Sequence, residues 1–426
     1  MFFVLVILLS FSGQGQEYVG GVLTQNSTYS PGLNPYIVTE PLIVPEGITL
    51  TIEAGTQLYF MVRTSLRVEG GVLLAQGLPG QEILFTSHGP GDNEKKWDGI
   101  NFFSSGYATD ESGNYLEGNL IQYSNVQLTT TGIVVSDTAG VFIESAGIRN
   151  CDYGLFLEDE GNITLKNSVV DQCSYGMYIK NSGSNIISSC EITNCDIGIF
   201  FPSNNNSRYN QIVNNNISNN RNIGLFLSLG QSTIQYNAIR NNTVSYNNIG
   251  LHIGNGGNAD AGFNSITGNI VHNNDIGIKL SQDKDTLKGN HVADNETGIL
   301  LSRASYSQIE YNYISGNRGW GMILTDASNN NRITGNNINN NLSGIKLTEK
   351  DLKYSVNNLI IGNNIARNTN EAILLEAGPQ SGIHYNSFTG REENLVVNRF
   401  ETNVPDTENY WFNSDTGLIR SEENPS

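Results

Sequence analysis

Three ionisable residues in the middle of the chain have types and spacing suited to acid–base chemistry. Asp275 and Glu296 each stand two residues before a glycine in two related segments, and His272 lies close by. Two neighbouring carboxyl groups can divide the roles of acid and base in glycoside chemistry, or bind a cation. The alternative is a pair of solvated turn residues, because Asp152 and Asp196 stand at the same position in other segments and Asp is common in turns.

A column of aromatic residues is the second candidate site. Phe156, Tyr178, Phe200 and Phe226 each stand two residues after a glycine in consecutive segments. On adjacent coils they would form an exposed stripe about 15 Å long. Such stripes often mark binding surfaces, and aromatic side chains anchor partners. The alternative is that the rings lie under a loop or only stabilise a sheet by stacking.

Both columns belong to one repeat, which must also position them. The phrase N-x-Φ-x-x-N-x-x-G-Φ-x-Φ, where Φ is apolar, recurs at steps of 21–27 residues, as in NIVHNNDIGIKL at 269–280. The residues after each glycine alternate with period two, which indicates a strand with one face inward. A unit of about 22 residues cannot bury itself and must stack on its copies. The sequence therefore predicts an all-β parallel solenoid of roughly 13–15 coils.

The asparagines of the phrase fall in two columns that contain no charged residue. Equivalent residues of neighbouring coils lie about 4.8 Å apart, so that one amide can donate to the next in an interior ladder. Two sequons, at Asn295 and Asn341, fall in one column, and we expect no glycan on either. The column before the apolar residue holds Asn215, Asn242, Asn269, Asn290, Asn312, Asn336 and Asn363, and the column after it holds Asn220, Asn247, Asn274, Asn295, Asn317, Asn341 and Asn368.

The four cysteines occupy the same columns. Cys151, Cys173 and Cys195 stand in three consecutive repeats of one column, and Cys190 stands in the other. They are either small buried side chains or include one axial disulfide, since neighbouring coils fall within disulfide range. The chain has no C-x-x-C, phosphate loop or nucleophile elbow, and we expect neither a metal nor a cofactor.

Charge and the chain ends limit the partners and the location. The formal charge is −18, which argues against nucleic acid and against polyanionic substrates. We predict a secretory signal peptide at 1–15, because its apolar run is too short to span a bilayer, and no later segment is apolar enough to be an anchor. We expect an N-terminal cap at 16–48, the β-helix at 49–390, and a C-terminal cap and tail at 391–426, because open coil ends must be covered.

The repeat phrase, with PYIVTEPLIVPEGITLTIEAGTQLYF at 35–60, resembles secreted right-handed parallel β-helix proteins of the pectin-lyase-like superfamily. With GGVL at 20–23 and NYW at 409–411, it is most similar among animal proteins to the β-helix modules of protein bark beetle, a membrane-anchored cell-junction protein. Phe412 replaces the glycine that usually follows NYW in those modules. The resemblance implies a right-handed coil, but such a repeat is specific for fold and not for function.

Our main hypothesis is a secreted, non-catalytic recognition or adhesion module that binds a glycan or another extracellular protein. The first alternative is a carbohydrate-active enzyme, a lyase, hydrolase or epimerase, that uses Asp275, Glu296 and His272. The second alternative is a structural matrix protein. A groove with convergent charged residues would favour the enzyme, and an uncovered aromatic column would favour the recognition module.

Overall fold

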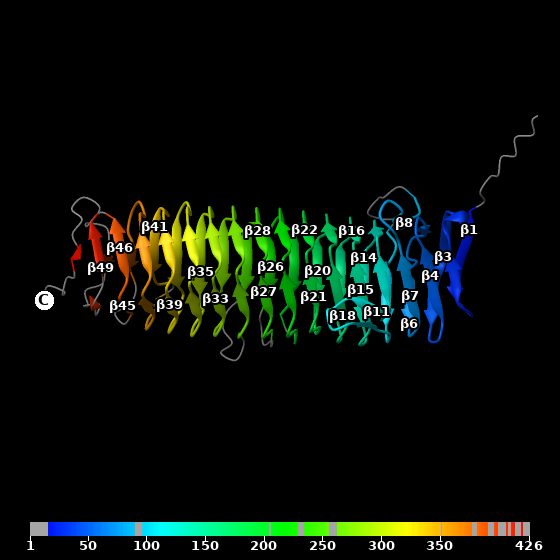
Figure 1. Ribbon diagram of the computed structural model, residues 1–426, viewed down its shortest axis with the longest axis horizontal. Helices are drawn as coiled ribbons and strands as arrows, with labels where there is room; N and C mark the ends of the chain where they lie inside the picture. The colour runs from blue at the N-terminus through cyan, green and yellow to red at the C-terminus, as the bar shows by residue number, and fades with distance from the viewer. Residues whose placement is uncertain are drawn as a thin grey trace, which may run out of the picture.

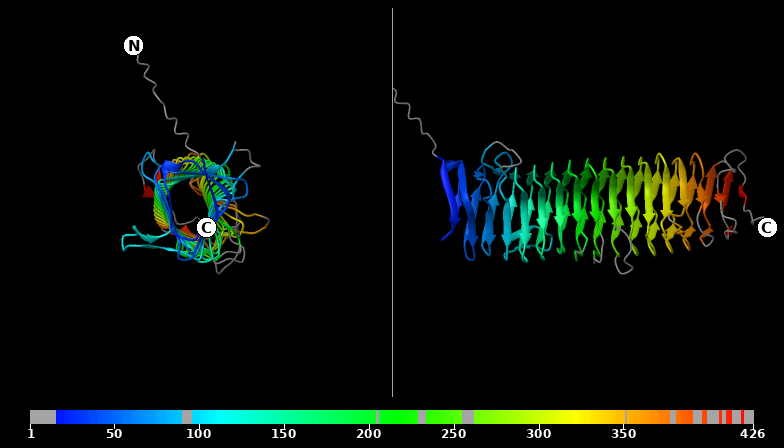
Figure 2. Two further views of the ribbon diagram at one scale, coloured as in Figure 1. Left: turned by 90° about the vertical axis from the view of Figure 1, so that its right-hand side faces the viewer. Right: turned by 180° about the vertical axis from the view of Figure 1, so that it is seen from behind.

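The chain winds into one long tube of stacked coils, with the first strands at one end and the last strands at the other (Figure 1). Viewed end-on, the coils superpose around a common axis (Figure 2). The prediction of an all-β, right-handed parallel β-helix with interior asparagine ladders is confirmed, with about 15 turns. The computed structural model describes residues 16–89, 96–203, 206–228, 234–254, 262–350, 352–376, 381–390, 396–398, 406–407, 410–413 and 419–420.

Each full coil contributes one short strand to each of three columns, which we call faces 1, 2 and 3 in chain order. Face 1 is a 16-stranded sheet. Its strands are β2(Ser27–Tyr29), β4(Thr49–Glu53), β7(Val72–Gln76), β12(Leu120–Gln122), β15(Gly140–Glu144), β18(Asn162–Lys166), β21(Ile186–Ser188), β24(Gln211–Val213), β27(Ala238–Arg240), β30(Ser265–Thr267), β33(Thr286–Lys288), β36(Gln308–Glu310), β39(Arg332–Thr334), β42(Leu359–Ile361), β45(Gly382–His384) and β48(Asp406–Thr407).

Faces 2 and 3 are the two halves of a 32-stranded sheet. Face 2 contains β5(Gln57–Phe60), β8(Ile83–Ser87), β13(Ser124–Gln127), β16(Gly147–Arg149), β19(Val169–Asp171), β22(Glu191–Thr193), β25(Asn216–Ser218), β28(Thr243–Ser245), β31(Ile270–His272), β34(His291–Ala293), β37(Tyr313–Ser315), β40(Asn337–Asn339), β43(Asn364–Ala366), β46(Ser387–Gly390) and β49(Tyr410–Asn413). Face 3 contains β6(Leu66–Glu69), β9(Ile100–Phe103), β14(Thr131–Ser136), β17(Tyr153–Leu157), β20(Tyr175–Ile179), β23(Ile197–Phe201), β26(Ile223–Leu227), β29(Ile249–Ile253), β32(Ile276–Leu280), β35(Thr297–Ser302), β38(Trp320–Thr325), β41(Ser343–Leu347), β44(Ile373–Leu375) and β47(Val396–Asn398).

The chain ends depart from this pattern. β1(Glu17–Val22) pairs in parallel with β3(Tyr36–Pro45), and β3 spans faces 2 and 3, so coil stacking begins within the segment that we expected to be a cap. The single turn of 3-10 helix is η1(Pro31–Leu33), among the residues described. At the other end β50(Ile419–Arg420) pairs antiparallel with β49, which changes the strand direction at the last coil. The capping role of both segments stays a prediction.

The core is one continuous column of apolar side chains inside the tube. Val244, Val271 and Val292 pair in register through β28, β31 and β34, and each is completely buried. Ile278 on β32 is equally buried from the third face. Because every inward residue stacks on its equivalent one coil away, a short apolar alternation in each repeat is enough to build a full core.

Both predicted asparagine ladders form inside the tube. Their side-chain amides donate to the next amide oxygen at 2.9–3.0 Å in the Asn215–Asn363 column. The distances are 2.8–3.2 Å in the Asn220–Asn368 column. The sharp left-handed backbone of the corner belongs to the residue before each ladder asparagine, such as Asn214 (φ 58°) and Asn219 (φ 58°), and not to the ladder residue itself.

A third ladder follows the same rule on the way to face 1. Asn185, Asn210, Asn237 and Asn264 donate in sequence at 2.7–3.0 Å, and Asn264 donates to Asp285 at 3.1 Å. This ladder was not predicted. The signal for it was present in the sequence, because each of these asparagines also stands two residues before a buried isoleucine, as Asn237 does before Ile239.

No helix among the residues that the structure covers is long and apolar enough to cross a membrane. The predicted signal peptide at 1–15 lies outside the described residues. One antiparallel hairpin, β10(Tyr107–Thr109) with β11(Tyr115–Gly118), interrupts the coil between β9 and β12.

Candidate functional site

The predicted aromatic column lies on the outer side of face 3. Phe156 and Tyr178 stack with ring centroids 4.9 Å apart and planes at 5°. Phe200 meets Tyr178 edge-on at 5.5 Å and stacks on Phe226 at 5.3 Å. The four side chains are half-buried. They come together because β17, β20, β23 and β26 are in register and their outward residues alternate with core residues.

Two further tyrosines widen this column. Tyr153 and Tyr175 stack on each other at 5.2 Å, and Tyr175 stacks on Phe200 at 5.6 Å. Each also meets the first column edge-on, as Tyr153 meets Phe156 at 5.5 Å. We call the six residues Tyr153, Phe156, Tyr175, Tyr178, Phe200 and Phe226 the aromatic patch. Sequence reasoning missed the two tyrosines, because each stands directly before the repeat glycine, three residues from Phe156 or Tyr178, where the period-two alternation does not predict an outward side chain.

Stacking and ligand binding compete for the same ring surface. Each ring of the patch covers part of its neighbour, which stabilises the sheet by cross-strand contact. His252 continues the stack at 4.4 Å from Phe226, but it is buried and neither ring nitrogen has a hydrogen-bond partner. Burial lowers the pKa of His252 to about 3, with a further contribution from Lys279, so the ring is neutral. The patch and His252 therefore carry no charge at neutral pH, and the tyrosine hydroxyl groups are the polar atoms of the patch.

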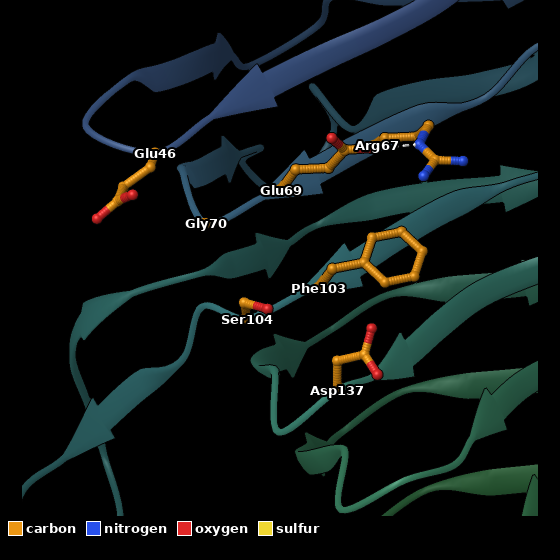
Figure 3. Close-up of a pocket in the computed structure, with 7 residues that line it drawn as sticks. All are labelled: Glu46, Arg67, Glu69, Gly70, Phe103, Ser104 and Asp137. Atoms are coloured by element: carbon orange, nitrogen blue, oxygen red, sulfur yellow. Dashed lines mark hydrogen bonds and ion pairs between the residues drawn. The ribbon is translucent and has the colours of Figure 1, made fainter.

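A cleft lies on the same face, in the coils nearer the N-terminus, and has a volume of about 590 Å³. Figure 3 shows the Arg67 side chain extending beside Phe103, with Asp137 directed toward that ring from the next coil. The Arg67 guanidinium lies 5.1 Å from the centre of the Phe103 ring, and its Nε is 2.7 Å from Glu69 Oε1. The cleft is lined by Glu46, Arg67, Glu69, Gly70, Phe103, Ser104 and Asp137.

Register places the cleft and the aromatic patch in one line. Arg67 pairs with Asn101, Asn101 with Val134, and Val134 with Phe156, on successive coils of face 3. Phe156 is the first residue of the patch row. The charged cleft and the apolar patch are thus consecutive parts of one surface that runs along the axis. The sequence did not indicate the cleft, because its residues come from four successive coils of unequal length.

The predicted acidic pair occupies one corner of two neighbouring coils. Asp275 and Glu296 directly precede the paired residues Ile276 and Thr297, and both are exposed. Glu296 Oε2 lies 3.4 Å from Arg318 Nε in the following coil. The corner therefore presents two solvated carboxylates, one of them in an ion pair. An exposed ion pair of this kind contributes little to the free energy of folding.

The histidine of the predicted acid–base group has other contacts. His272 ends β31 on face 2, where its Nδ1 lies 2.7 Å from the Asn273 side-chain amide. Its ring meets Tyr246 edge-on at 6.1 Å. An acid–base role for Asp275, Glu296 and His272 stays a hypothesis.

The cysteine column lies inside the tube, where the Asn220–Asn368 ladder continues it. Cys151, Cys173 and Cys195 are 3%, 5% and 2% exposed, and all four cysteines are free. Each thiol lies 3.2–3.4 Å from the carbonyl oxygen two residues before it. Hydrogen bonds from the outer two thiols hold the pKa of Cys173 below its ordinary value, and the same bonds, with burial, raise the pKa of Cys151 and Cys195. The three cysteines lie one above the other on successive coils, because Arg149, Asp171 and Thr193, which stand two residues before them, pair in register.

Cys190 provides a contrast within the same tube. It occupies the other column, where the Asn215 side-chain oxygen accepts its backbone N–H at 2.9 Å. Burial raises the pKa of its thiol to about 12.

The stacked coils and the interior asparagine ladders define a right-handed parallel β-helix protein. The sequence model of the family described as "Periplasmic copper-binding protein (NosD)" matches residues 89–234 and 237–420. The chain belongs to that family. No curated protein matches the chain, so the resemblance to the modules of protein bark beetle stays a prediction.

Solved structures that resemble this chain share little sequence with it. A double mutant of the periplasmic alginate epimerase AlgG is 16% identical over 85% of this chain and 78% of that one, with a TM-score of 0.36. The A-module of the Azotobacter vinelandii mannuronan C-5 epimerase AlgE6 is 14% identical over 88% and 92%, with a TM-score of 0.36. Tailspike protein 3 of bacteriophage CBA120 is 11% identical over 95% and 62%, with a TM-score of 0.38. These are similarities of fold alone.

Proposed function

We propose that this protein is an extracytoplasmic, non-catalytic recognition module that binds an extended, neutral glycan along face 3. One observation carries the proposal: the Arg67–Phe103 cleft and the aromatic patch lie on consecutive coils of one outer face. The predicted signal peptide at 1–15 would supply export, and the family description names the periplasm.

The chemistry of the two parts suits a sugar chain. Aromatic rings offer apolar contact to the C–H faces of sugars, while guanidinium and carboxylate groups bind hydroxyl groups by hydrogen bonds. The coil spacing of about 4.8 Å is close to the length of one sugar residue in an extended chain. The formal charge of −18 favours a neutral glycan over an acidic one.

A glycan array followed by calorimetry on the best ligand tests this function. We expect Tyr178→Ala/Phe226→Ala to weaken binding at least about tenfold, or by about 1.4 kcal/mol. The matched control is Tyr306→Ala, which removes a tyrosine that is 59% exposed and lies outside the patch. If the double alanine variant unfolds, Tyr178→Val/Phe226→Val retains strand propensity and serves in its place.

Other results would select the alternatives. Equal weakening in the patch variant and the control would reject the patch. Capture of an extracellular protein through the patch, without glycan binding, would support the adhesion function that the bark beetle resemblance implies. Release of reducing ends or unsaturated sugars, abolished by Asp275→Asn or Glu296→Gln, would support the enzyme. Absence of any ligand would favour a structural matrix protein.

Copper carriage is a second candidate function, because the family description names copper. The described residues contain no group of three or more His, Cys, Asp or Glu side chains that could hold a metal ion. The thiol column fits copper in another way, because thiolates are the soft ligands that Cu(I) prefers. Cu(I) also forms stable complexes with only two thiolates. The three buried cysteines stacked on successive coils are the observation that favours this candidate.

A further inference from the structure

We infer that Cys151, Cys173 and Cys195 form an internal site that holds Cu(I) between successive coils, one ion for each neighbouring pair of thiols. This inference rests on the second proposed function, copper carriage, and assigns the residues. Cys173 would be shared by both ions, because it stands between the other two cysteines in the column.

The geometry of the coil provides the spacing. Asp171 pairs with Arg149 on one side and with Thr193 on the other, so the cysteines two residues after each are in register. Equivalent atoms of neighbouring coils lie about 4.8 Å apart. A metal ion with bonds of about 2.3 Å to a thiolate on each side spans nearly the same distance. Each pair of stacked thiols can therefore hold one ion along the axis without a change of fold.

The surroundings of the three thiols favour binding of a soft metal ion over oxidation of the thiols. The three side chains are at most 5% exposed, which keeps water and larger oxidants away. Binding is not a redox step: each Cu(I) displaces the protons of the thiols that it joins, those protons go to solvent, and no electron is transferred. The ion must enter while the coils assemble, because the finished tube encloses the column.

Metal loading during refolding tests the inference. Denatured, fully reduced protein is refolded without oxygen in the presence of excess Cu(I), desalted, and analysed for copper per chain. We expect two ions for the wild type, one each for Cys151→Ser and Cys195→Ser, and none for Cys173→Ser. The matched control is Cys190→Ser, which removes an equally buried thiol outside the column and should keep both ions.

Two further measurements separate a site from a folding effect. Serine should be tolerated, because Thr129 already places a hydroxyl in the same column, and the unfolding midpoint of each variant checks this. X-ray absorption at the copper edge should show a shell of two sulfur ligands. Oxygen or nitrogen ligands, equal copper loss in Cys190→Ser, or full loading of folded Cys173→Ser would overturn the site.

The same measurements distinguish failure of the proposed copper carriage from failure of the proposed cysteine site. If the wild type binds copper and Cys173→Ser binds the same amount, copper carriage stands and the thiol column is rejected. If the wild type binds none, both are rejected. A disulfide between two of the three cysteines after anaerobic refolding with Cu(I), found by mass spectrometry, would also overturn the inference.

Discussion

The side-chain amide of Asn274 donates a hydrogen bond to Asn295 Oδ1 in the next coil, at 3.0 Å, and the same oxygen accepts the Asn274 backbone N–H at 2.9 Å. The amide also donates to the carbonyl oxygen of Val244, one coil earlier, at 3.2 Å. One residue therefore ties three coils together. A coil corner would otherwise leave buried backbone groups without hydrogen-bond partners. Each ladder asparagine supplies those partners, and the ladder forms a continuous hydrogen-bonded row along the axis.

Replacing one member of this row should destabilise the tube. We expect Asn274→Ala to lower the free energy of unfolding by about 1–3 kcal/mol or more, because it leaves buried partners in two coils without a hydrogen bond. Urea unfolding followed by circular dichroism measures the change. Asn216→Ala, at an exposed position on β25, is the control and should change little. A similar loss in both variants would contradict a ladder contribution.

The repeat glycine should resist substitution for a steric reason. A methyl group on Gly250 would lie 2.6 Å from the Gly277 carbonyl oxygen and 3.1 Å from the Asn274 amide nitrogen. We expect Gly250→Ala to cost about 1–3 kcal/mol of stability through this overpacking. Gly106→Ala, where a methyl group would meet nothing within 4 Å, is the control. A thermal unfolding midpoint for Gly250→Ala equal to that of the wild type would show that the coils shift apart without cost.

The fully buried Asp285 should make stability depend on pH. It replaces an asparagine in the third ladder and accepts hydrogen bonds from Asn264 and Gln282. Burial raises its pKa to about 7, and Asp283 adds to the shift. In an unfolded chain the pKa is about 3.9. Between roughly pH 4 and pH 7 the folded state therefore keeps a proton on Asp285 that the unfolded chain has lost. The free energy of unfolding accordingly falls as the pH rises through that window.

Asp285→Asn isolates this contribution. We expect the variant to gain stability relative to the wild type by about 1.4 kcal/mol for each pH unit between those limits. It should be the more stable protein at pH 8, since an amide there completes the ladder and can pair with the unsatisfied Gln282 oxygen. Urea unfolding of both proteins at pH 5, 6, 7 and 8 gives the difference between their free energies of unfolding. A difference that does not change with pH would show that Asp285 stays charged throughout and would contradict the prediction.

Burial should also decide which sequons can be modified. Asn295 and Asn341 are buried in a ladder, whereas Asn216 and Asn241 are exposed. Expressed in a host that attaches N-linked glycans, the folded protein should carry sugar on the exposed pair and none on the buried pair. Glycopeptide mapping checks this, and sugar on Asn295 in folded protein would contradict the inward placement.

The contacts that sequence reasoning missed lie outside the repeat phrase or at positions where the phrase specifies no residue type. The third ladder was overlooked because Asp285 and Ser307 interrupt its run of asparagines, although both occupy the ladder positions. The cleft around Arg67 and Phe103 has no repeated motif at all. His252 fits the outward alternation of an exposed side chain, and yet it is buried. The burial of such a residue depends on side chains of other coils that pack against it, and the sequence of its own repeat does not specify them.

By itself, the sequence determined the coil, the inward apolar row and two amide ladders. The physical reason is that a unit of about 22 residues with alternating apolar positions has one way to bury them, which is in register on its own copies. The tertiary structure alone decided that the cleft and the aromatic patch share one outer line and that the acidic corner is solvated. These relations depend on how loops and side chains of successive coils pack, and the repeat period does not set that packing.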